Sequence, residues 1–264
     1  MDLRQLDEIA AAATVSPIEA DVAGWWCKAA PDLPFRRCNV ALPPVDAAAD
    51  RGRFLAGLGE VRAWYRRHGL RLIVQVSSAM PASDRVDGWL SACGMVVEAP
   101  VQVMVVESDV QQDRYLGGSL GRVLVAPGID AAWAEAYGSL FGGGPVEVAR
   151  TQAYGRMLVA HGDRALGASC RIDGRTVGVG FGVLDRGWMG VFGMVTAPSH
   201  RRQGIARDVL LALRRAAHDR GVDRAYLQVE PDNAAALAVY GSSGFEISHR
   251  YHYRSEGLDV DLGR

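Results

Sequence analysis

The chain contains 264 residues, of which 49% are hydrophobic and 22% are charged, and its formal net charge is −1. This composition is typical of a globular protein and argues against a largely disordered chain. The near-zero charge gives no general attraction to nucleic acid, and no segment approaches the ~20 consecutive apolar residues of a membrane-spanning helix.

The first half of the chain is predicted to contain both helices and strands. In the second predicted helix, apolar residues recur at the three- and four-residue spacing of one helix face: Phe54, Leu55, Leu58, Val61 and Tyr65. Gly69 and Gly94 are placed where a glycine commonly ends a helix. The helices are predicted over residues 1–20, 48–68 and 84–93, and the strands over residues 25–29, 35–42, 70–76 and 96–106.

The second half is predicted to contain a run of strands followed by alternating helices and strands. Asp173-Gly174 is a typical hairpin turn, and Ile205, Val209 and Leu213 form one apolar helix stripe. The glycines and proline of residues 142–145 should interrupt the chain. The strands are predicted over residues 122–126, 165–172, 176–184, 188–195, 226–229 and 245–253, and the helices over residues 130–141, 146–158, 202–219 and 232–242.

The two halves repeat the same order of elements. Each half has a strand, a proline, a helix, a glycine, a strand, a helix and a final strand, and Pro43 corresponds to Pro198 at an offset of ~155 residues. Gly94 corresponds to Gly244 at an offset of ~150. We therefore expect two domains, at residues 1–110 and 122–264, joined by a linker at residues 111–121.

The segment from Met194 to Arg207 has the features of an anion-binding turn. A predicted strand ends, a proline follows, and a basic turn containing Gly204 opens a helix. The first N–H groups of a helix have no internal acceptor, and the helix dipole adds positive charge there. Residues 199–224 contain seven arginines and three aspartates. A bulky anion such as a diphosphate is the expected ligand, although neither a dinucleotide fingerprint nor a P-loop is present.

Residues 201–206, RRQGIA, resemble the Arg/Gln-x-x-Gly-x-Gly/Ala signature of the GNAT superfamily of acyl-CoA-dependent N-acyltransferases. The segments PSHRRQGIARDVLLAL and LQVEPDNAAALAVYGSSGF also follow the order and spacing of that superfamily. The resemblance implies a mixed α/β GNAT fold in the C-terminal half and a partial GNAT-like repeat in the N-terminal half. It also implies acetyl-CoA as co-substrate and no metal.

The resemblance also assigns roles to residues. Tyr240 matches the tyrosine that protonates the departing CoA thiolate, and Asn233 matches an asparagine that contacts the pantetheine region. These two residues are seven apart, which places them on one helix face, and a tyrosine with a pKa near ~10 is protonated at neutral pH. The other matches are the strand that pairs with the pantetheine arm, Met194, Val195 and Thr196, and the pyrophosphate-binding turn, Arg202, Gln203, Gly204, Ile205, Ala206 and Arg207.

The implied reaction is direct attack of a neutral primary amine on the thioester through a tetrahedral intermediate. We expect a strand-end N–H, that of Val195, to hold its oxyanion. Several family members have Glu where this chain has Gln228, which cannot act as a base. Glu230 is the candidate base that we favour, and His249 and His252 are alternatives.

The first half lacks these groups. Residues 45–50, which align with the basic turn, contain Asp46 and Asp50 and no glycine, and Leu90 occupies the position of Tyr240. Acidic side chains at that turn would repel a phosphate. We therefore predict that residues 1–110 are a degenerate GNAT-like domain.

The predicted function is an acetyl-CoA-dependent N-acetyltransferase acting on a small-molecule or protein amine. The alternatives are a non-catalytic acyl-CoA-binding module and a protein-interaction scaffold. The N-terminus lacks the pattern of a secretory signal, so a cytoplasmic protein is expected, with no nucleic-acid or membrane partner. The sequence does not predict the oligomeric state. The dispersed cysteines do not have metal-ligand spacing: Cys27, Cys38, Cys93 and Cys170.

Overall fold

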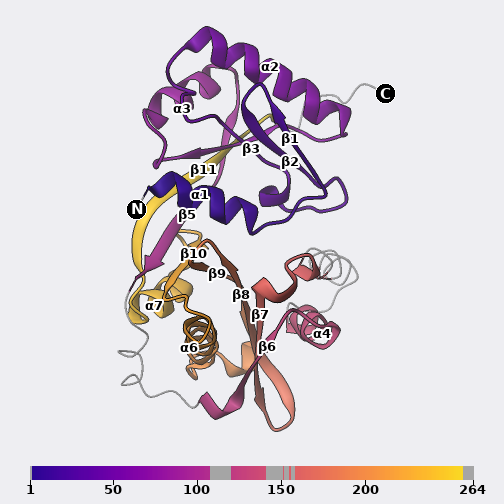
Figure 1. The fold of residues 1–264 in the computed structure, drawn as a ribbon, viewed down its shortest axis with the longest axis vertical. Helices are drawn as coiled ribbons and strands as arrows, with labels where there is room; N and C mark the ends of the chain where they lie inside the picture. Colours follow the sequence, from indigo (N-terminus) through magenta and orange to yellow (C-terminus); the bar gives the residue numbers. More distant parts are fainter. Residues whose placement is uncertain (1, 108–119, 141–150, 152–154, 156–157, 258–264) are drawn as a thin grey trace. The chain divides into compact units, whose positions relative to one another are not determined.

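The structure is a computed structural model that describes residues 2–107, 120–140, 151, 155 and 158–257 (Figure 1). The chain divides into two compact units, which we call unit 1 (Met1–Gln102 with His249–Arg264) and unit 2 (Val103–Ser248). Both boundaries fall inside strands, β5 (Val96–Val106) and β11 (Glu246–Ser255). Most of the predicted linker at residues 111–121 and of the predicted helix at residues 146–158 lies outside the described residues.

Unit 1 combines helices with a mixed sheet. β3 and β4 are parallel, and the other neighbouring pairs are antiparallel. The last strand of the chain thus pairs with β4 in unit 1, from Tyr251 opposite Ser77 to Ser255 opposite Ile73. The helices are α1 (Leu3–Ala12), α2 (Arg51–Arg67) and α3 (Ser83–Ala92), and the strands lie in the order β1 (Ile18–Val22), β2 (Trp25–Ala29), β3 (Ala41–Leu42), β4 (Ile73–Ser77) and β11.

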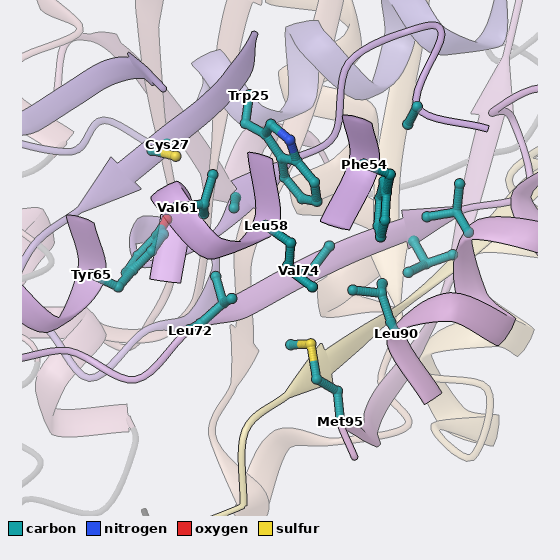
Figure 2. Close-up of a cluster of buried hydrophobic side chains, with 14 of the residues drawn as sticks. Trp25, Cys27, Phe54, Leu58, Val61, Tyr65, Leu72, Val74, Leu90 and Met95 are labelled. Carbon is teal, nitrogen blue, oxygen red and sulfur yellow. The ribbon is translucent and has the colours of Figure 1, made fainter. Parts of the chain in front are cut away.

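The apolar core of unit 1 lies between its sheet and the helices α2 and α3. Figure 2 shows Trp25, Phe54 and Leu58 pointing into this cluster together with Val74 and Leu90. The structure confirms the predicted helix and most of its buried face. Four of the five residues of the predicted stripe are buried, and the fifth, Leu55, is 36% exposed. Burial of these side chains is the main force that holds α2 against the sheet.

One predicted strand of unit 1 is largely wrong. Residues 35–42 form a short 3₁₀ helix (Arg36–Cys38) and the two-residue strand β3. Asn39 explains the difference, because its side-chain Oδ1 accepts a hydrogen bond from the N–H of Ala30 at 2.7 Å and its Nδ2 donates to the carbonyl of Leu33 at 2.8 Å. These bonds close residues 30–39 into a loop that a sequence pattern does not reveal.

Unit 2 is a second mixed α/β unit. β9 and β10 are parallel, while the other neighbouring pairs are antiparallel, which confirms the predicted mixed fold class. The strands lie in the order β10 (Arg224–Val229), β9 (Trp188–Thr196), β8 (Arg175–Asp185), β7 (Ala165–Ile172) and β6 (Val123–Pro127), and the helices are α4 (Ala131–Leu140), α6 (Ile205–His218) and α7 (Ala234–Ser242).

Helices α6 and α4 cover opposite faces of the unit 2 sheet (Figure 1). On the α6 face, a Cβ at Gly178 would collide with Ile205, and one at Gly180 would lie 2.9 Å from Val209. These glycines let the first two turns of α6 approach β8 closely. No helix in the described part of the chain is long and apolar enough to cross a membrane.

Candidate functional site

The end of β9 carries a β-bulge. Val195 is opposite Val179, and Phe192 is opposite Phe181, so β9 has one more residue than β8 in this interval. Gly193 adopts φ +59°, and a Cβ at this position would lie 2.8 Å from the ring of Phe181. The bulge therefore depends on glycine, and it redirects the strand end that the sequence assigned to pantetheine binding.

Beyond the bulge, one edge of β9 is not covered by β10. The described parallel ladder runs from Arg224–Trp188 to Leu227–Val191. On the other edge, the N–H of Ala197 donates to the carbonyl of Val177 at 2.8 Å. Because successive residues of a strand present their polar groups to opposite edges, the N–H of Val195 faces β8 and that of Thr196 faces the uncovered edge. The expected oxyanion donor, the N–H of Val195, is thus directed to β8 and not to the uncovered edge.

The turn before α6 contains two left-handed residues. Arg202 has φ +61° and Gly204 has φ +78°. Gly204 is also the N-cap of α6, and no side chain caps the helix there. The first intrahelical bond to this residue is donated by the N–H of Asp208 at 2.9 Å, so the N–H groups of Ile205, Ala206 and Arg207 have no acceptor within the helix. Such a group of N–H donors is a favourable site for an anion.

The arginines of this turn are not neutralised by carboxylates in the described part of the chain. Arg201 and Arg202 are exposed, and the Nε atom of the half-buried Arg207 is buried without a partner there. The nearest acid in sequence, Asp208, is 3% exposed and pairs with Arg122, whose Nη2 lies 2.6 Å from its Oδ2. The turn therefore keeps its positive charge.

Asn233 and Tyr240 lie at the two ends of α7. Asn233 is the N-cap, and its Oδ1 accepts a hydrogen bond from the N–H of Ala236 at 3.1 Å. Tyr240 packs against the core of unit 2, with its ring centroid 6.2 Å from that of Phe245. Burial raises the pKa of Tyr240 to about 12, so its hydroxyl keeps its proton at neutral pH.

The candidate bases occupy different environments. Glu230 lies one residue beyond β10 and is exposed, whereas the side-chain oxygen of Gln228 is buried without a partner in the described part of the chain. In unit 1, Nε2 of His249 lies 3.0 Å from Asp7, and Nε2 of His252 lies 2.6 Å from Asp87. Both histidines are thus engaged within unit 1.

Comparison with known proteins identifies the family. The family described as "Probable histone acetyltransferase Rv0428c C-terminal" matches residues 1–254. The chain belongs to this family. The match covers both halves, so the family includes the N-terminal half that the sequence predicted to be degenerate.

Individual relatives agree with this membership. The "Uncharacterized N-acetyltransferase YobR" of Bacillus subtilis is 38% identical over 72 residues, which are 27% of this chain and 29% of that protein. The match to a second curated N-acetyltransferase spans 53% of its length, so the chain covers about half or less of these relatives.

Solved structures confirm the GNAT fold. A GCN5-related N-acetyltransferase from Kribbella flavida has a TM-score of 0.71 and 17% identity, and the match covers 99% of this chain and 98% of that one. A tandem GNAT protein from the clavulanic acid biosynthesis pathway has a TM-score of 0.65 and 16% identity, covering 85% and 76%. The predicted tandem GNAT arrangement is therefore confirmed at the level of the fold.

Sequence reasoning missed one residue at the turn. Arg122 lies 86 residues from Asp208, and its Nη2 also donates to the carbonyl of Gln203 at 3.2 Å. No local pattern connects these positions, because the contact forms only when the segment before β6 packs beside the start of α6.

Proposed function

We propose that unit 2 binds acetyl-CoA and transfers its acetyl group to a primary amine. The observation that carries this proposal is the turn before α6, where Arg202 and Gly204 are both left-handed and no side chain caps the helix. Family membership supports the same class of reaction.

The residues of the turn fit a diphosphate. The free N–H groups of Ile205, Ala206 and Arg207 would donate to its oxygens, and Arg201 and Arg202 would add charge. A Cβ at Gly204 would meet nothing within 4 Å, so the space beside this residue is open to a ligand. Gln203 belongs to the same turn and contributes its backbone.

The uncovered edge of β9 fits an extended amide-bearing arm. The polar backbone groups of Thr196 face that edge, whereas Met194 packs against α6 beside Gly180 and Val195 pairs with β8. We propose that the pantetheine arm of acetyl-CoA continues the sheet there in place of β10 and that the N–H of Thr196 supports the oxyanion.

Tyr240 is the proposed general acid. A hydroxyl with a pKa of about 12 is protonated at neutral pH, and a thiolate leaving group needs a proton. Asn233 would orient the pantetheine region with its free amide N–H groups, because its Oδ1 is engaged as the cap of α7. Glu230, which is exposed at the end of β10, would accept the proton of the attacking amine through water.

The proposed acceptor is a primary amine, carried by a small molecule or a protein. The word histone in the family description favours a protein amine. Acetyl-CoA would act as co-substrate, and no step requires a metal.

The test is a pair of measurements on the full chain. Titration calorimetry with CoA and acetyl-CoA should show one site per chain. A thiol-release assay with acetyl-CoA and a panel of amines and peptides should then show turnover. Binding without turnover across the panel would identify an acyl-CoA-binding module instead, and absence of both would leave only the scaffold role.

A further inference from the structure

Arg122 forms a bridge between Asp208 and the backbone of the anion-binding turn. Its Nε and Nη2 atoms both donate to Oδ2 of Asp208, at 3.0 and 2.6 Å, and Nη2 also donates to the carbonyl of Gln203 at 3.2 Å. The side chain of Arg122 is 26% exposed and that of Asp208 is 5% exposed, so the ion pair is shielded from solvent on one side. Shielding strengthens both the pair and its bond to the carbonyl.

The carbonyl that Arg122 holds belongs to the peptide between Gln203 and Gly204. In a trans peptide, the C=O and N–H groups point in opposite directions. Fixing the Gln203 carbonyl on Arg122 therefore directs the N–H of Gly204 away from Arg122. This peptide lies between the two left-handed residues of the turn, Arg202 and Gly204.

This peptide is free to rotate unless something holds it. Gly204 has no side chain, and it tolerates the backbone angles of both peptide orientations. The opposite orientation would present the Gln203 carbonyl, which carries partial negative charge, where the N–H of Gly204 now lies. An anion would then meet an acceptor in place of a donor.

Asp208 explains why an arginine performs this role. Its carboxylate is buried and lies in the first turn of α6, where it would repel an incoming diphosphate if it were unpaired. The guanidinium of Arg122 neutralises that carboxylate, and the carboxylate in turn fixes the guanidinium beside the carbonyl. The two side chains therefore depend on each other to hold the backbone of the turn.

We propose that Arg122 is a positioning residue for diphosphate binding, which holds the Gln203–Gly204 peptide with its N–H directed to the ligand. This inference rests on the proposed binding of CoA at this turn. Arg122 itself does not touch the ligand in this proposal, so its loss should weaken CoA binding without changing the chemical step.

The experiment uses the variants Asp208→Asn and Arg122→Met/Asp208→Asn in the full chain. Arg122→Met alone would leave a buried unpaired carboxylate and could unfold the protein. The double variant avoids this problem, and comparison with Asp208→Asn isolates the contribution of Arg122. Arg220→Met is the matched control, because Arg220 donates to the carbonyl of Asp163 at 2.7 Å and follows the C-terminal end of α6, whereas the turn precedes its N-terminal end.

Three readouts are needed. By calorimetry, CoA should bind about tenfold more weakly to the double variant than to Asp208→Asn. In the acetyl-transfer assay the KM for acetyl-CoA should rise by the same factor, and kcat should stay the same. By hydrogen-exchange mass spectrometry of the ligand-free proteins, the amides of residues 202–207 should exchange about tenfold faster in the double variant, and Arg220→Met should match the wild type.

Equal CoA affinity and equal exchange in Asp208→Asn and the double variant would overturn the proposal, as would a fall in kcat without a change in KM. If wild-type protein did not bind CoA at all, the proposed function would fail. The exchange measurement would then still decide whether Arg122 orders the turn.

Discussion

The helices α2 and α6 occupy equivalent places in the two copies of the repeat, yet their first turns differ in chemistry. In α2, the N-cap Asp50 accepts a hydrogen bond from the N–H of Arg53 at 2.7 Å, and Asp46 lies 2.7 Å from the guanidinium of the same arginine. In α6, the N-cap is Gly204 and no side chain caps the helix. The same helix terminus therefore receives an anion from its own chain in one copy and remains available for a ligand in the other.

The two units also differ in whether these arginines are paired with carboxylates. In unit 1, Arg71 binds Glu98 through two hydrogen bonds of 2.7 and 3.0 Å, and Arg254 binds Asp87 at 2.6 Å. At the turn of unit 2, Arg201 and Arg202 have no carboxylate partner in the described part of the chain. We therefore expect anion binding at this helix start to depend on whether local carboxylates already neutralise it, and not on the fold alone.

The most direct test of this difference is to place a carboxylate at the start of α6, as in α2. Gly204→Glu should weaken CoA binding about a thousandfold, because a carboxylate about 4 Å from a phosphate costs about 4 kcal/mol at an effective dielectric of about 20. Calorimetry with CoA measures this effect.

Gly204→Ala is the matched control, since Gly204 has φ +78° and alanine introduces the backbone strain without the charge. The strain should lower the free energy of unfolding by about 1 kcal/mol. Equal CoA affinity for Gly204→Glu and wild type, with both proteins folded by circular dichroism, would show that the turn is not the diphosphate site.

The second prediction concerns Tyr240, for which the first copy has Leu90. Tyr240→Phe should lower kcat about a hundredfold and leave the affinity for acetyl-CoA nearly unchanged, because it removes only the donated proton. Burial raises the pKa of Tyr240 to about 12, so the ratio of wild-type to variant kcat should be constant from about pH 6 to about pH 10.

Phe245→Leu serves as the comparison variant, because it alters the packing beside Tyr240, whose ring centroid lies 6.2 Å away, and leaves the hydroxyl in place. A kcat of Tyr240→Phe that equals the wild-type value would exclude the hydroxyl as the acid. A ratio that falls as the pH rises from about 8 to about 10 would show that the pKa is not raised.

Much of the fold could be predicted from the sequence. Helix periodicity located α2 and α6, and the repeat predicted the correspondence between the two halves. The strand at residues 35–42 failed because Asn39 forms side-chain bonds to the backbone of Ala30 and Leu33, and such bonds depend on how the loop closes. The strand β11 was predicted, but its pairing with β4 could not be, since strand partners depend on distant segments.

The candidate site was predictable in its local part only. The turn at Gly204 and the pair Asn233 and Tyr240 come from contiguous segments. The structure places Tyr240 within α7 and Asn233 at its N-cap, just before the helix and not on its face. The other parts of the site could not be predicted. Which part of β9 stays uncovered depends on how β10 pairs with it, and the contact of Arg122 with Gln203 joins residues 81 positions apart. The roles of these residues stay predictions until the variants are measured.

The third prediction tests the claim that the charges of unit 1 are paired internally. Glu98 is 20% exposed, and hydrogen bonds from Arg71 lower its pKa to about 2. Glu98→Gln should reduce the free energy of unfolding at neutral pH by about 2 kcal/mol. A lowered pKa stabilises the fold above the ordinary value of 4.5, so this contribution should disappear as the pH falls from about 4.5 to about 2.

Denaturant titrations at several pH values measure this loss. Asp46→Asn is the control, because the Asp46–Arg53 pair is exposed and should contribute less than about 0.5 kcal/mol. A difference between Glu98→Gln and wild type that stays constant down to about pH 2 would contradict the assigned pairing.

The smallest predicted effect comes from the opposite change, which removes the capping carboxylate from the start of α2. Asp50→Ala removes the cap of α2 and should lower the free energy of unfolding by about 1 kcal/mol, because the N–H of Arg53 loses its acceptor.

The Asp50→Ala substitution should not create a second CoA site. Asp50 has φ −140°, so the start of α2 lacks the left-handed turn that gathers N–H groups in unit 2, and Asp46 remains beside it. Calorimetry should still show one CoA per chain. Asp84→Ala is the comparison variant, because Asp84 lies in the first turn of α3 but does not cap that helix. It should lower the free energy of unfolding by less than Asp50→Ala does. A second bound CoA in Asp50→Ala would mean that an open helix start is sufficient for binding, and that the arginines and the left-handed turn before α6 are not required.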